Sequence, residues 1–138
     1  MLTDRQVSDF FAAYQESLAQ NDFEGLGRLY HESFVFAGPA AALAVKKAEF
    51  MAVLPKRRAY FSGLGLAGSR VERIDTSPMD ERYVSVRVSW VMTFTDSARQ
   101  PLPIFATYIL KHEGDQPVIV FQLDHQDLAA AVGAQHQG

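Results

Sequence analysis

The stretch RYVSVRVSWVMTFT, residues 82–95, decides the fold class of this chain. Its apolar and polar residues alternate with the period of a β-strand, in which successive side chains point to opposite faces. One face consists of Val84, Val86, Val88, Trp90, Met92 and Phe94, and the mixed face of Tyr83, Ser85, Arg87, Ser89, Val91 and Thr93. We therefore expect a long strand whose even-numbered side chains point inward, beneath a layer of helices.

Further strands are expected on both sides of this one. Residues 66–74 precede it, and residues 102–111 and 118–125 follow it, the last two joined by a turn that contains Gly114. Long strands joined by short turns favour an antiparallel meander.

The N-terminal half has helical periodicity instead. Thr3 and Gln6 fit a capping box, and apolar residues recur at helical spacing through residue 18. The elements expected next are a short helix after Asn21, a strand at 33–37, and a helix at 46–61 that Pro55 kinks or restarts. Because helices precede strands, we predict one α+β domain at residues 1–128, with residues 129–138 as a frayed C-terminal tail.

Composition excludes several classes of function. The chain has 138 residues, a net charge of −3 and no cysteine, so it has no disulfide and no thiolate metal ligand or nucleophile. The basic cluster at residues 56–58 is interpreted as a solvated helix face, and nucleic-acid binding is not expected. No apolar run approaches the roughly 20 residues that span a membrane, and the start is not typical of a signal peptide. We expect a cytoplasmic protein that does not bind membranes.

Three segments resemble the nuclear-transport-factor-2-like or SnoaL-like superfamily: FFAAYQESLAQNDFEGLGRLYHESFVF (10–36), TYILKHEG (107–114) and VIVFQLDHQDL (118–128). In that pattern a long helix ends at a small polar turn, a short helix ends in Leu-Tyr, and a Phe-rich strand follows. The resemblance covers nearly the whole chain and implies helices packed into a strongly curved antiparallel sheet, a cone with an internal pocket. It implies a fold better than a function, because members include isomerases, dehydratases, cyclases, hydrolases and binding modules.

The resemblance extends to ketosteroid isomerase, whose chemistry needs a general base and hydrogen-bond donors for an oxyanion. Aligning the Leu29-Tyr30 pair puts Tyr14 at the position of that enzyme's oxyanion tyrosine. The position of the basic aspartate is Gly38, and that of the second donor falls near Ala106. With the base and the second donor missing, we do not expect steroid-type isomerisation.

Alternation along the strands predicts the lining of the pocket. The predicted side chains are Phe34, Phe36, Trp90, Met92, Ala106, Tyr108, Phe121 and Leu123. In one interpretation they surround a small, largely apolar ligand and support acid/base chemistry of isomerase, dehydratase or cyclase type. In the other, they fill the core of a non-catalytic dimeric protein-interaction module.

His125 and Tyr14 are the candidate catalytic residues. His125 ends the predicted inward row of the last strand, where an imidazole can act as an acid or a base, and the alternative is a structural rim residue. Tyr14 and Tyr108 can donate hydrogen bonds to a ligand. Since Asp124 and His125 point to opposite faces of a strand, we expect no metal site, and no motif indicates a cofactor.

The outward-facing side chains are typical of a protein interface, because hydroxyl, amide and aromatic groups mix there. They include Arg87, Phe105, Thr107, Ile109, Gln122 and Asp124. We expect a two-fold homodimer through this outer sheet face, with Arg87 and Asp124 as a candidate ion pair. The alternative is a monomer whose C-terminal tail covers the face.

Overall fold

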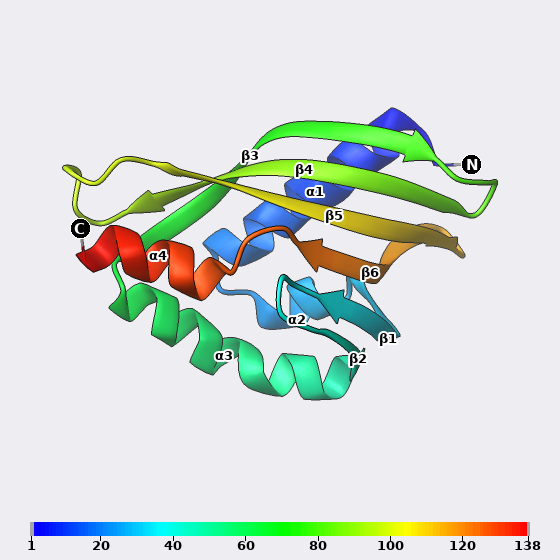
Figure 1. Cartoon of the computed structure of the whole chain (residues 1–138). Helices are drawn as coiled ribbons and strands as arrows, with labels where there is room; N and C mark the ends of the chain where they lie inside the picture. Colours follow the sequence, from blue (N-terminus) through cyan, green and yellow to red (C-terminus); the bar gives the residue numbers. More distant parts are fainter. Residues whose placement is uncertain (1, 138) are drawn as a thin grey trace.

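The structure is a computed structural model that describes residues 2–137, and the side chains of residues 2–133. In chain order its elements are α1 (Asp4–Ala19), α2 (Phe23–Gly27), β1 (Tyr30–Ala37), β2 (Ala42–Lys46), α3 (Lys47–Gly63), β3 (Leu66–Pro78), β4 (Tyr83–Phe94), β5 (Leu102–Glu113), β6 (Gln116–Asp124) and α4 (Leu128–Gln137). Figure 1 shows α1 crossing behind β3 and β4, with α3 below the other end of the sheet. Within residues 2–137, no helix combines the length and hydropathy needed to cross a membrane.

The strands form one open, curved sheet in the order β2-β1-β6-β5-β4-β3. From β3 to β6 it is the antiparallel meander that the sequence predicts. The α+β class is therefore confirmed. The sheet is mixed, however, because β1 pairs with β6 in parallel. Strand β2 was not predicted from the sequence. It is a short edge strand that pairs with β1 and is mostly exposed.

The long strand β4 points its even-numbered side chains into the core, as expected. Val86 and Val88 are fully buried, and Trp90 is 4% exposed. They pack in one cluster with residues of α1, whose capping box is present with bonds of 2.8 and 3.1 Å between Thr3 and Gln6. Burying one such apolar side chain contributes about 1.5–3 kcal/mol, so this layer holds α1 against the sheet.

Two predicted segments differ from the structure. Residues 47–63 form one continuous helix with Pro55 inside it. Residues 128–137 form α4 where a frayed tail was expected, and Val132 of this helix is completely buried. Arg99 holds α4 in place, because its guanidinium donates to the backbone oxygens of Leu64 at 2.8 Å and Val132 at 3.1 Å. The tail assignment was wrong because an alanine-rich segment shows little amphipathic pattern until its packing partner is known.

Strand β6 contains a β-bulge that reverses its faces. Leu110 of β5 pairs with Ile119, but the residue before it, Ile109, pairs with Phe121. Val120 is thus an extra residue in β6, and beyond it every side chain changes face relative to strict alternation.

Candidate functional site

A cavity of about 290 Å³ lies between α1, α3 and the inner face of the sheet. Its floor is buried and mainly aromatic or apolar, and includes Tyr14, Tyr30, Trp90, Met92, Ala106 and Tyr108. Its mouth is the part where lining residues are exposed: Ala19, Asn21, Arg57 and Ala67. The site is therefore a small apolar hollow that opens between the end of α1, the middle of α3 and the start of β3.

Most of the lining predicted on β1, β4 and β5 is present. Phe36, Trp90, Met92, Ala106 and Tyr108 all line the cavity, as does Tyr14 of α1. Phe34 does not belong to this lining. It is buried against the rings of Tyr30 and Phe50, with ring centroids 4.7 and 5.2 Å away.

The residues predicted on β6 lie on the wrong face, because of the bulge at Val120. Phe121 pairs with Ile109 and Leu123 with Thr107, so both stand on the outer face. The predicted inward placement of Phe121, Leu123 and His125 was therefore wrong. His125 Nε2 lies 2.7 Å from Thr107 Oγ1, within hydrogen-bond distance. This contact fits the alternative interpretation, in which His125 is a structural residue at the rim.

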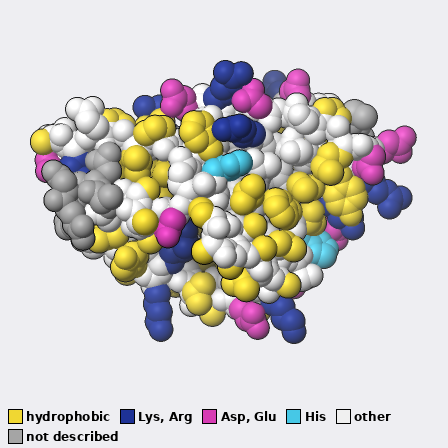
Figure 2. Space-filling model, viewed as in Figure 1, with side chains coloured by type: hydrophobic (Ala, Val, Ile, Leu, Met, Phe, Trp, Pro, Cys, Tyr) yellow, Lys and Arg dark blue, Asp and Glu magenta, His cyan; other side chains and the backbone are white. Residues whose placement is uncertain are grey.

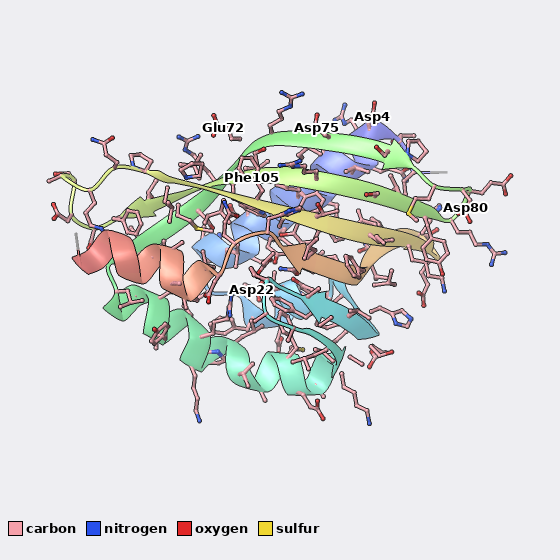
Figure 3. The ribbon with its side chains drawn as sticks, in the orientation of Figure 1. Asp4, Asp22, Glu72, Asp75, Asp80 and Phe105 are labelled. Atoms are coloured by element: carbon pink, nitrogen blue, oxygen red, sulfur yellow. The ribbon has the colours of Figure 1, made fainter. Side chains whose placement is uncertain are left out.

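The outer face that these residues share contains half-buried apolar groups. It is continued on β5 by Phe105, labelled in Figure 3, over whose ring the Arg87 guanidinium lies at 4.9 Å. In the view of Figure 2, hydrophobic side chains gather over the middle of the molecule, and charged ones lie mainly around its edge.

Gln122 and Asp124 occupy the inward positions instead. Gln122 pairs with Tyr108 and Asp124 with Ala106, and both side chains line the cavity. Strict alternation predicts both on the outer face, with Asp124 near Arg87, and that prediction was wrong. Their polarity within an apolar strand was the available signal, but alternation alone assigns them to the wrong side.

A chain of hydrogen bonds joins these polar groups across the floor of the cavity. Gln122 Nε2 donates to Asp124 Oδ1 at 3.1 Å, which turns the amide oxygen toward Tyr30. The Tyr30 hydroxyl donates to that oxygen at 2.6 Å. Since a phenol has one proton, Tyr14 is the donor in its 2.8 Å bond to Tyr30.

The third tyrosine of the floor, Tyr108, accepts a hydrogen bond of 3.2 Å from Trp90 Nε1. Its ring centroid lies 5.9 Å from that of Tyr14. Burial raises the pKa of Tyr14, and raises the pKa values of Tyr30 and Tyr108 well above the ordinary value. All three phenols are therefore neutral at physiological pH. The protons of Tyr30 and Tyr14 are used within the chain that ends at Gln122, so Tyr108 is the phenol that can donate to a ligand.

Asp124 is the titratable acid of the cavity. Burial raises the pKa of its carboxyl, while the hydrogen bond from Gln122 and the charges of Arg57 and His125 lower that pKa in part. A carboxyl with a raised pKa takes up and returns a proton closer to neutral pH than an exposed aspartate does. Chemically, the arrangement combines a proton acceptor, a phenolic hydrogen-bond donor and apolar walls.

Metal ligands are not gathered at this site. Among the residues that the structure describes, no group of three or more His, Asp or Glu side chains is close enough to hold a metal ion. The donors of the cavity are phenols, one amide and one carboxyl, a set suited to proton transfer and hydrogen bonding.

Comparison with known families identifies the chain's relatives. The family model described as NTF2-like protein (DUF6841) matches residues 3–127. The chain belongs to this family. No curated protein matches the sequence.

Solved structures share the fold of this NTF2-like chain at low sequence identity. An NTF-2 like protein of unknown function from Shewanella oneidensis MR-1 is 13% identical, with a TM-score of 0.73, and the match covers 88% of this chain and 98% of that one. ActVI-ORFA from Streptomyces coelicolor is 16% identical, with a TM-score of 0.70 and coverage of 90% and 97%. The beta subunit of the benzoate 1,2-dioxygenase from Burkholderia mallei ATCC 23344 is 13% identical, with a TM-score of 0.69 and coverage of 99% and 98%. Such likeness shows a shared fold and leaves the function to the site.

Asp124 lies next to the position near which the alignment with ketosteroid isomerase leaves an acid missing. The resemblance to ketosteroid isomerase places the second oxyanion donor, a carboxylic acid, near Ala106. In the structure Ala106 pairs with Asp124 of the neighbouring strand, and both line the cavity. An acid thus stands beside the expected place, on β6 instead of β5.

Proposed function

We propose that this NTF2-like protein binds a small, largely apolar molecule in the cavity and that Asp124 exchanges a proton with it. The chemistry would be of isomerase, dehydratase or cyclase type. The observation that carries the proposal is a partly buried carboxyl with a raised pKa in the wall of an aromatic cavity. Perturbed acids in apolar clefts are typical of general acid/base sites.

The neighbouring side chains have matching roles in this proposal. Tyr108 is a neutral phenol in the floor, and it donates a hydrogen bond to a carbonyl or hydroxyl oxygen on the ligand. Such a donor stabilises negative charge that develops on that oxygen when a proton leaves the adjacent carbon. Tyr14 donates its proton to Tyr30, so toward a ligand hydroxyl it acts as a hydrogen-bond acceptor. Trp90 and Met92 contact the apolar part of the ligand and keep water away from the carboxyl.

The alternative function, a non-catalytic interaction module, requires a filled core. The cavity of about 290 Å³ favours the first proposal, since a filled core has few voids larger than one water molecule. At this size, near the lower end of ligand pockets, the ligand would have one or two rings.

Hydrogen–deuterium exchange on 2-tetralone tests the proposed proton transfer without knowledge of the natural substrate. In D₂O, the protein should accelerate exchange at the carbon next to the ketone, measured by NMR. Asp124→Asn should lower that acceleration by roughly 100-fold, the usual contribution of a general base. Asp115→Asn, an exposed turn position, is the matched control and should leave it unchanged.

Binding is measured separately through Trp90, the single tryptophan of the chain. Titration with 2-tetralone should shift its fluorescence in the wild type and in Asp124→Asn alike. Exchange that persists in Asp124→Asn would show that Asp124 is not the group that exchanges the proton. If the wild type shows no accelerated exchange and no fluorescence shift, the proposed function as a whole is contradicted.

A further inference from the structure

The mouth of the cavity carries positive charge that the proposed proton transfer does not use. Arg57 and Arg58, successive residues of α3, both line the cavity. The sequence had suggested a solvated helix face for this basic cluster. In the structure two of its three members stand at the opening between α1 and β3.

Arg58 is held in place as part of the mouth. Its Nε donates to Asn21 Oδ1 at 3.0 Å, and Nη2 donates to the backbone oxygen of Ala67 at 3.3 Å. These bonds join the segment after α1 to the start of β3 across the opening. Arg58 therefore shapes the mouth and adds a fixed positive charge there.

The N–H groups of the Arg57 guanidinium, in contrast, are not paired with any described side chain, through either an ion pair or a hydrogen bond. The guanidinium lies over the ring of Phe61, 5.0 Å from the ring centroid, and Phe61 also lines the cavity. Stacking on an aromatic ring orients a planar guanidinium while leaving its N–H groups free for an anion.

The charge at the mouth is thus positive in a chain whose net charge is −3. Asp124 is the acidic side chain of the lining, against the two arginines. Burial also disfavours the charged form of Asp124, whereas both arginines stay charged. An anionic group entering the mouth would meet net attraction, and its apolar remainder would lie toward Trp90.

We propose that the ligand of this cavity is a small apolar molecule bearing one anionic group of carboxylate type, which binds Arg57 at the mouth. The inference rests on the proposed function, since it names the ligand class of the same cavity. A carboxylate accepts two N–H bonds from one guanidinium, whereas a neutral apolar molecule makes no use of it.

Two isosteric probes, 2-naphthoate and 2-naphthamide, test this inference by isothermal titration calorimetry. The wild type should bind the carboxylate more tightly than the amide. Arg57→Gln should weaken 2-naphthoate binding roughly five- to tenfold, as expected for one partly exposed charged contact, and change 2-naphthamide binding less than about twofold. Lys56→Gln removes the adjacent charge, which does not line the cavity, and should change neither affinity.

The outcomes separate this inference from the function on which it rests. If both probes bind, are displaced by 2-tetralone, and keep the same affinities in Arg57→Gln, the anion site is overturned and the proposed function stands. An equal loss of 2-naphthoate affinity in Lys56→Gln and Arg57→Gln would show general charge attraction and also overturn it. If neither probe nor 2-tetralone binds the wild type, both proposals fail.

Discussion

Gln122 is the residue through which the two ends of the cavity's polar chain are coupled. Its Nε2 donates to Asp124 and its Oε1 accepts from Tyr30, and it is 6% exposed. Ionised Asp124 can only accept hydrogen bonds, so it orients the amide and, through it, the phenols of Tyr30 and Tyr14. Protonation of Asp124 weakens that orientation, so the charge of the acid and the direction of the floor's donors change together.

The raised pKa of Asp124 predicts how stability depends on pH. Burial lifts its folded-state pKa above the ordinary value of 3.8, so the ionised form is disfavoured in the folded protein. Its favourable contribution is complete below pH 3.8 and is lost as the pH rises through the folded-state pKa. Asp124→Asn avoids this loss, so its melting temperature should rise relative to the wild type over that pH range.

Melting curves of the wild type and Asp124→Asn from pH 3.5 to 8 measure the effect. Asp115→Asn controls for the removal of a negative charge at an exposed position. A difference between wild type and Asp124→Asn that stays constant over the whole range would contradict the raised pKa.

Among the helices and strands, β6 and α4 have the strongest influence on the site. The bulge at Val120 turns Gln122 and Asp124 inward and Phe121 outward. Helix α4 then follows β6 directly and adds Leu128 to the cavity lining. Both features lie at the end of the chain where periodicity gave the poorest prediction.

Helix α4 is predicted to be a structural part of the domain. Val132→Asp would bury a charge at a completely enclosed position, which should cost roughly 3 kcal/mol or more in the free energy of unfolding. Ala130→Asp, on the exposed side of the same helix, should change it by less than about 1 kcal/mol. Urea titrations followed by Trp90 fluorescence measure both. Equal, small effects would mean that the segment behaves as the frayed tail that the sequence suggested.

At the scale of the whole molecule, the outer face of the sheet is a surface that the proposed cavity chemistry does not use. A contiguous apolar row crosses three strands there, because Val35 of β1 pairs with Phe121 of β6, and Phe121 pairs with Ile109 of β5. Val35 is 37% exposed, and the other two side chains are half-buried. The described contacts of α4 through Leu128 and Val132 lie with the cavity and the core.

We propose that the outer face forms a two-fold homodimer, since an apolar row with polar neighbours suits an interface. Sedimentation at micromolar concentration should give about twice the chain mass of 15.4 kDa. Ile109→Lys should shift the protein to a monomer, whereas Leu43→Lys, a 63% exposed hydrophobic position on the edge strand, should not. A wild-type mass near that of one chain would exclude the dimer.

The sequence by itself determined the fold class, the order of the elements other than β2 and α4, and the inward face of β4. It also gave Tyr14, Trp90 and Tyr108 as cavity residues. These follow from local periodicity, since a period of two assigns faces as long as a strand gains no extra residue.

The tertiary structure decided the rest. Whether Val120 is an extra residue depends on how β6 pairs with β5, and that pairing alone turns Asp124 into the cavity and His125 away from it. Likewise, α4 and the mouth arginines take their roles from segments distant in the chain, such as Arg99 for α4 and Asn21 for Arg58. Local patterns carry no information about such partners, because long-range contacts form only when the chain folds.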